Sequence, residues 1–283
     1  EDAKTMKDQQ YGYNLLMIAT INGKIDMFKY LIAKEYFSEE DAKTMKDQYG
    51  SNLLMLAIGK GRIDMFEYLI AKNYFSKEDA KTMKNQSGNN LLILANIYGK
   101  INMFEYLITK NYFSEEDAKI MKDQYGNNLL ILATFNGHIN MFEHLIVEEY
   151  FSKEDVQTMN NNGYNLLMLA TIYGHINIFK YLITKEYFSK EDAKTIKNQD
   201  GNNLLILATF NGSIDMFKYL ITENYFSKED AKIMKDQYGY NLLMLATAKG
   251  EIDMFEYLIA KNYFSEEDAK TMKDQQYGYN LLM

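Results

Sequence analysis

The sequence contains no cysteine, proline or tryptophan in 283 residues, and Arg62 is its only arginine. Without cysteine the chain can form no disulfide bond, and it can supply no thiolate nucleophile or cysteine ligand for zinc or an iron–sulfur cluster. This absence leaves the cellular compartment open. The formal net charge of −8 argues against a general nucleic-acid-binding protein. No apolar run approaches the roughly 18 residues of a membrane-spanning helix, so we expect no membrane insertion.

The residues that are present suit a folded protein, because 47% are hydrophobic and 25% are charged. The bias toward Lys, Asn, Ile, Tyr and Phe is what AT-rich codons encode, and it indicates a low-GC genome. The chain begins at Glu1 without a methionine, which indicates a piece of a longer protein or a processed product.

An internal repeat organises the whole chain. The pair Glu-Asp recurs at intervals of 37 to 39 residues, and no linker or change of composition interrupts the series. We therefore predict a single continuous array over residues 1–283, in which each unit packs on its neighbours. The predicted units are 1–39, 40–77, 78–115, 116–153, 154–190, 191–228, 229–266 and a partial unit 267–283.

The second unit shows the pattern within each repeat. Asn52 precedes an apolar run and Gly61 follows it, which predicts a short helix with an asparagine N-cap and a left-handed glycine at its end. Residues 63–70 place their large apolar side chains at helical spacing and predict a second, amphipathic helix. Ser76, with Asp79 three residues later, predicts the capping box of a short third helix.

This unit resembles the ankyrin repeat. Residues 123–146, DQYGNNLLILATFNGHINMFEHLI, follow the order of turn glycine, short helix, second glycine and longer helix that the family shows. The resemblance implies an all-α fold, an ankyrin-like helical repeat solenoid or superhelix with about three helices per 38-residue unit. A different alpha-alpha superhelix is the alternative.

The sequence also departs from the ankyrin pattern. Asn128 and Leu129 stand where the family has the threonine and proline of T-P-L-H, and the family's histidine is lost. Each unit is longer than the usual 33 residues or so. From the resemblance we expect the extra Y-F-S-x-E-D-A-K segment to displace the β-turn finger that ankyrin repeats project.

The sequence shows no constellation for catalysis. His138 and His175 hold a variable loop position that we expect to face solvent, and His144 replaces a tyrosine found in other units. Acidic clusters such as Glu115-Glu116-Asp117 follow a serine at predicted helix starts, which favours capping over calcium binding. No phosphate-binding, dinucleotide-binding or zinc-protease motif is present. We predict a protein that is not an enzyme and needs no cofactor.

Aromatic residues suggest which surface of the protein would contact a partner. Seven Tyr-Phe pairs, from Tyr36-Phe37 to Tyr263-Phe264, favour a core role, with an exposed stripe for bases or sugars as the alternative. Comparison of the units shows variation after the turn glycine and at the tail of the first helix, where the ankyrin resemblance places a concave binding surface. Neutral drift on an exposed face is the alternative explanation. The candidate interaction residues are Tyr13, Tyr98, Phe135, Tyr164, Tyr173, Phe210, Tyr240 and Tyr279.

The two ends of the chain carry the same sequence. Residues 1–17 and 267–283 are identical, which suggests a higher-order repeat of seven units within a longer array. Our first hypothesis is therefore a non-enzymatic structural protein that builds a filament or fibre from copies of itself, end to end or laterally. The alternative is a scaffold or effector module that grips another protein on its concave face.

Overall fold

The computed structural model describes residues 6–160 and 162–271, and every regular element in these ranges is a helix. The predicted order of three helices per repeat is confirmed. The first helices are α2 (Leu15–Ile21), α5 (Leu53–Gly59), α8 (Leu91–Ile97), α11 (Leu129–Phe135), α14 (Leu166–Ile172), α17 (Leu204–Phe210) and α20 (Leu242–Lys249). The second helices are α3 (Ile25–Ala33), α6 (Ile63–Ala71), α9 (Ile101–Thr109), α12 (Ile139–Val147), α15 (Ile176–Thr184), α18 (Ile214–Thr222) and α21 (Ile252–Ala260). The third helices are α4 (Glu39–Thr44), α7 (Lys77–Thr82), α10 (Glu115–Ile120), α13 (Lys153–Gln157), α16 (Lys190–Thr195), α19 (Lys228–Ile233) and α22 (Glu266–Thr271).

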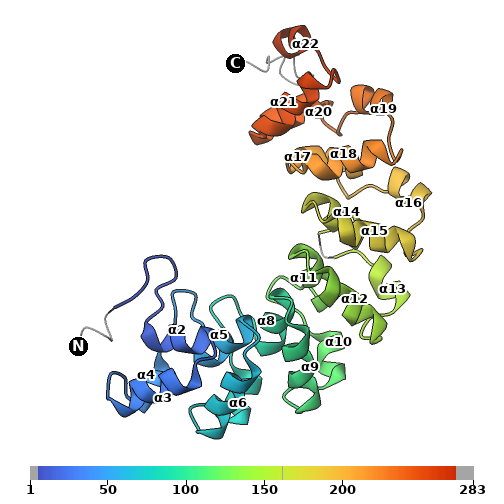
Figure 1. Ribbon diagram of the computed structural model, residues 1–283. Helices are drawn as coiled ribbons and strands as arrows, with labels where there is room; N and C mark the ends of the chain where they lie inside the picture. The colour runs from blue at the N-terminus through green and yellow to red at the C-terminus, as the bar shows by residue number, and fades with distance from the viewer. Residues whose placement is uncertain (1–5, 161, 272–283) are drawn as a thin grey trace. The chain divides into compact units, whose positions relative to one another are not determined.

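The chain forms two compact units, residues 1–151 and residues 152–283. In the first unit α2, α5, α8 and α11 contact one another in series, and each packs on the second helix of its own repeat. In the second unit α14, α17 and α20 form a similar series (Figure 1). A single continuous array over all 283 residues stays a prediction.

The first helix of each repeat is buried almost all round because its sequence is a run of apolar residues. Leu53, Leu54 and Ala57 of α5 are completely buried. Asn52 caps this helix as predicted, since its side-chain oxygen accepts a hydrogen bond of 3.0 Å from the backbone N–H of Met55. Gly61 follows with φ +66°, the left-handed conformation expected from its position after the helix.

The second helix ends in a way the sequence did not indicate. The residue after its C-cap is left-handed in seven repeats, with φ of +54° to +57°, and none of these residues is a glycine. Asparagine adopts this conformation at little cost, whereas glutamate is strained there. The residues are Glu35, Asn73, Asn111, Glu149, Glu186, Asn224 and Asn262.

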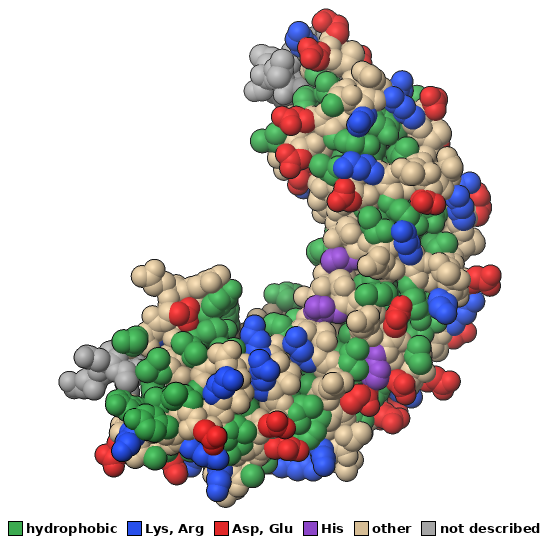
Figure 2. All heavy atoms as spheres, in the orientation of Figure 1, with side chains coloured by type: hydrophobic (Ala, Val, Ile, Leu, Met, Phe, Trp, Pro, Cys, Tyr) green, Lys and Arg blue, Asp and Glu red, His purple; other side chains and the backbone are tan. Residues whose placement is uncertain are grey.

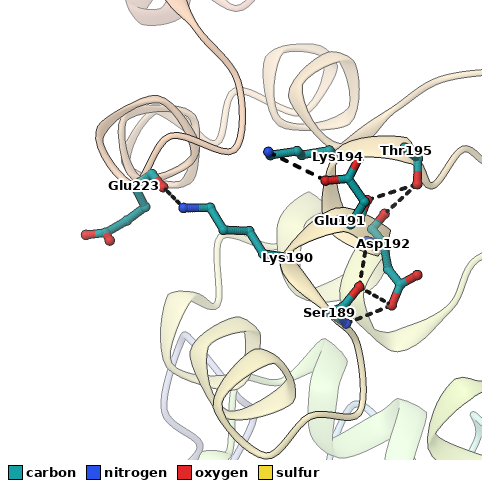
Figure 3. Close-up of polar contacts among 7 residues, drawn as sticks. All are labelled: Ser189, Lys190, Glu191, Asp192, Lys194, Thr195 and Glu223. Atoms are coloured by element: carbon teal, nitrogen blue, oxygen red, sulfur yellow. Dashed lines mark hydrogen bonds and ion pairs between the residues drawn. The ribbon is translucent and has the colours of Figure 1, made fainter.

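The third helix begins with the predicted capping box and ties neighbouring repeats together. In α16, Ser189 and Asp192 exchange side-chain and backbone hydrogen bonds, as Figure 3 shows. The ammonium group of Lys190 donates a 2.7 Å hydrogen bond to the carbonyl oxygen of Glu223, in the next repeat (Figure 3). It also lies 5.2 Å from the centre of the Tyr225 ring. Lys77 and Lys228 make the same bond from their third helices, so in these three repeats the extra segment tethers one repeat to the next.

The β-turn finger is retained, so the expectation that the extra segment displaces it was wrong. Lys122 and Asn128 form an antiparallel bridge across the turn that contains Gly126. The backbone N–H groups of Tyr125 and Asn127 both donate to Asp123 Oδ1 and hold the turn closed. The added residues form a helix before the finger, which leaves the finger itself in place.

The Tyr-Phe pairs belong mainly to the core, as predicted. Tyr74 and Phe75 are each only 7% exposed. Phe28, in the preceding repeat, meets the Tyr68 and Tyr74 rings edge-on, at centroid distances of 5.6 and 5.4 Å. Tyr36 differs from this pattern and is 45% exposed.

Candidate functional site

The predicted interaction residues lie at finger tips and at the ends of first helices, and all seven that the structure describes are accessible to solvent. Tyr98 and Tyr173 are 47% and 50% exposed. Half-buried side chains make up the rest, namely Tyr13, Phe135, Tyr164, Phe210 and Tyr240. Tyr279 lies outside the described residues.

A groove of about 420 Å³ on the first compact unit brings two of these residues together. Tyr13 comes from the first finger and Tyr98 from the end of α8. Tyr11 and Tyr49 line the same groove from neighbouring finger tips, and the rings of Tyr11 and Tyr13 stack with their centroids 5.2 Å apart. We call this feature, lined by Tyr11, Tyr13, Asp47, Tyr49, Gly59 and Tyr98 among others, the aromatic groove. Figure 2 shows the hydrophobic side chains, with tyrosine among them, between charged residues on the visible face of each unit.

Gly59 shapes the aromatic groove. The equivalent position, the last residue of the first helix, holds Ile21 and Ile97 in the adjacent repeats. A Cβ atom added to Gly59 would lie 3.3 Å from the ring of Tyr98, so the missing side chain lets this ring lie against α5. Glycine is a poor helix former, and its presence at a helix end here opens space on the surface.

Asp47 supplies the negative charge of the groove. Its carboxylate is largely buried, and Oδ1 accepts hydrogen bonds of 2.9 and 2.8 Å from the backbone N–H groups of Tyr49 and Ser51. Burial and the Asp47 carboxylate raise the pKa of Tyr13 to about 12. The same two causes, burial first, raise the pKa of Tyr98. Both phenols are therefore neutral at pH 7 and can donate or accept hydrogen bonds.

The other predicted residues do not line this groove and have separate surroundings. The Tyr164 hydroxyl accepts a 3.3 Å hydrogen bond from Asn198. The Lys249 ammonium lies 3.9 Å from the ring centre of Phe210, and Tyr173 stacks on His175. These contacts hold Tyr164, Tyr173 and Phe210 of the second compact unit in place, but they do not bring the three side chains together in one site.

The comparison of repeats within the sequence did not identify the residue before the turn glycine as a candidate for interaction. Tyr49, Tyr125 and Tyr238 occupy this position and are 53%, 72% and 61% exposed. Ser87 and Asp200 hold the same place in other repeats, so the same internal comparison, made two residues earlier, would have detected it.

His138, at the loop position before the second helix, contacts the preceding repeat and is only partly exposed, where the sequence predicted a solvent-facing side chain. His138 is half-buried, and its Nε2 lies 2.7 Å from the carbonyl oxygen of Ile97 in the preceding repeat. Arg62 and Ser213 bond to the equivalent carbonyl groups, those of Ile21 and Ile172. Histidine, arginine and serine can replace one another at these three positions because each supplies one donor directed at the end of the previous first helix.

His144 packs between repeats, at the position that holds a tyrosine in other repeats. Its Nε2 lies 2.7 Å from Glu105 Oε1, and its ring meets those of Phe104 and Tyr150. Within the described ranges, no three His, Asp or Glu side chains gather where a metal ion could bind. None of the described helices has the length and apolar character needed to cross a membrane.

The buried tyrosines give the protein a defined response to alkaline pH. Burial raises the pKa of Tyr74 and Tyr263, like that of Tyr13, to about 12. Because these folded-state values lie above the ordinary value of 10.0, the stabilisation is complete below pH 10 and is lost as the pH rises toward 12. We expect the free energy of unfolding, measured with urea, to fall over this interval. A native-state absorbance titration in which all phenols ionise together near pH 10 would contradict this result.

Taken together, the stacked three-helix repeats define a helical repeat protein, and it carries exposed aromatic side chains at its fingers and at the ends of its first helices. The family model described as ankyrin repeats (3 copies) matches residues 1–79, 72–153, 92–192, 144–232 and 185–271. The chain belongs to the ankyrin repeat family. Ankyrin repeats mediate protein–protein interactions and are generally non-enzymatic. A search of curated proteins gives no match to the chain.

Proposed function

We propose that this protein is a binding scaffold that grips a partner protein through the aromatic groove. The observation that carries the proposal is the convergence of Tyr11, Tyr13, Tyr49 and Tyr98 on one groove of about 420 Å³. Tyrosine is enriched at protein interfaces because it offers a large apolar face and a polar hydroxyl with little conformational freedom to lose.

The surroundings of the four tyrosines support recognition over a purely structural role. Tyr11, Tyr49 and Tyr98 are 38%, 53% and 47% exposed, whereas Tyr74, a core tyrosine, is 7% exposed. Packing restrains three of the four rings, since Tyr11 and Tyr13 stack on each other and Tyr98 lies against Gly59. A preformed aromatic surface loses little side-chain entropy on binding, and this favours affinity.

A random peptide library displayed on phage, selected against the purified chain, tests the proposal. We expect selected peptides to bind the native protein in calorimetry and to lose about tenfold or more in affinity with Tyr98→Ala. Tyr173→Ala is the matched control, because Tyr173 holds the same repeat position in the second unit and is equally exposed. Peptides that bind Tyr98→Ala and Tyr13→Ala as tightly as the native chain would show that the groove is not the binding surface.

The alternative function is self-association into a fibre, in which the partner is another copy of the chain. The identity of residues 1–17 and 267–283 supports it. Sedimentation velocity separates the two functions. Polymers that grow with protein concentration would favour the fibre. A discrete species that binds the selected peptides would favour the scaffold.

A further inference from the structure

We propose that the aromatic groove holds an arginine side chain of the partner protein, with its guanidinium group against the tyrosine rings and paired with the Asp47 carboxylate. This inference rests on the proposed function and adds the chemistry that the partner must present. Three features of the groove lead to it: an incompletely used carboxylate, a set of aromatic faces, and the balance of charge.

The first feature is the second oxygen of Asp47. In the finger of the fourth repeat, Asp123 uses Oδ1 for two backbone N–H groups, and its Oδ2 accepts a 3.0 Å hydrogen bond from Asn127. In the second repeat Ser51 stands in place of Asn127, and no described residue donates to Oδ2 of Asp47. Asp47 is only 8% exposed, so this carboxylate is a strong acceptor with little solvent around it.

The second feature is the aromatic lining. Tyrosine rings carry negative charge on their faces, and a cation placed over such a face is attracted to it. The groove supplies the stacked pair Tyr11 and Tyr13 on one side and Tyr98 on another. Arginine suits these surfaces better than lysine does, because its flat guanidinium group stacks on rings and directs several N–H donors in one plane.

The third feature is charge. Lys60 is the cation in the lining, and it is exposed at the C-terminal end of α5, whereas Asp47 is buried. Solvent screens the charge of Lys60 more strongly than that of Asp47, so the carboxylate dominates the interior of the groove. The net charge of −8 on the whole chain also attracts a cationic partner.

Asparagine occurs naturally at the position of Asp47 in other repeats, which provides a variant that removes only the charge. Asn85 Oδ1 accepts 3.0 Å hydrogen bonds from the backbone N–H groups of Ser87 and Asn89 and closes its finger in the same way. Asp47→Asn should therefore keep the fold of the loop. Asp123→Asn is the matched control, because it makes the same change in a finger that does not line the groove.

The test is an NMR titration of the full chain with the blocked tripeptide acetyl-Gly-Arg-Gly-amide. We expect shifts of the Tyr13 and Tyr98 ring signals, weaker binding of the citrulline and lysine tripeptides, and no such shifts with the glutamate tripeptide. Asp47→Asn should lower the affinity for the arginine peptide about tenfold, and Asp123→Asn should leave it unchanged. Equal binding of arginine and citrulline peptides, preferred binding of the glutamate peptide, or full affinity in Asp47→Asn would each overturn the inference.

The same variants separate this inference from the proposed function. If library-selected peptides depend on Tyr98 but bind Asp47→Asn at full affinity, the arginine inference is wrong and the scaffold proposal stands. Peptides that bind the native chain, Tyr98→Ala and Tyr13→Ala equally well would reject both.

Discussion

Replacing Phe66 with alanine is expected to lower the free energy of unfolding of the first compact unit by about 3–5 kcal/mol. Phe66 is completely buried in α6, and its ring meets Tyr106 and Tyr112 of the next repeat edge-on, with centroids 5.7 and 5.3 Å apart. The substitution removes apolar area, leaves a cavity and breaks two aromatic contacts between repeats. Urea denaturation followed by circular dichroism measures the loss.

Phe66→Leu is the matched control, since leucine keeps most of the apolar volume but cannot form the edge-on contacts. We expect a smaller loss with leucine than with alanine, and the difference between the two reports the cost of the cavity. Hydrogen exchange should show lost protection mainly in α6 and the helices next to it, because each repeat packs on its neighbours. An equal loss of protection in both compact units would contradict this local picture.

The local structure of each repeat could be predicted because short sequence signals determine it. The asparagine before the first helix and the Ser-x-x-Asp capping box each satisfy backbone groups within a few residues of themselves. Their positions therefore fixed the order of the three helices without knowledge of the packing. The finger was mispredicted because its closure depends on Asp123 Oδ1 and two backbone N–H groups, a turn the ankyrin comparison did not suggest for this longer unit.

The aromatic groove could be predicted only in part. Internal variation selected Tyr13 and Tyr98, but it also selected Phe135, which lies in the same compact unit and does not line the groove. Tyr98 reaches the groove because Gly59, one repeat earlier, has no side chain to block its ring. A contact of this kind between repeats cannot be predicted from the sequence of either repeat alone. The bond from His138 to Ile97 was missed for the same reason, since 41 residues separate the two.

Replacing Asn96 is also expected to have a large effect on the free energy of unfolding, in this case a gain in stability. Asn96 is completely buried in α8, and neither Oδ1 nor Nδ2 of its side chain has a hydrogen-bond partner among the described residues. Other repeats place threonine at this position, with the hydroxyl group donating a 2.9 Å hydrogen bond to the carbonyl oxygen four residues earlier. Those residues are Thr20, Thr134, Thr171, Thr209 and Thr247.

Asn96→Thr should therefore raise the free energy of unfolding by about 1–3 kcal/mol, the usual cost of burying polar atoms without partners. Threonine would also gain the hydrogen bond to the carbonyl oxygen of Leu92. Asn96→Ile, which copies the buried Ile58 of the preceding repeat, separates these two contributions because it removes the amide without adding a hydroxyl group. Both variants should unfold at higher urea concentration than the native chain. A loss of stability in both variants would mean that the amide is satisfied within the fold. If both variants bind the selected peptides as tightly as the native chain does, the buried amide of Asn96 is not needed for binding at the aromatic groove.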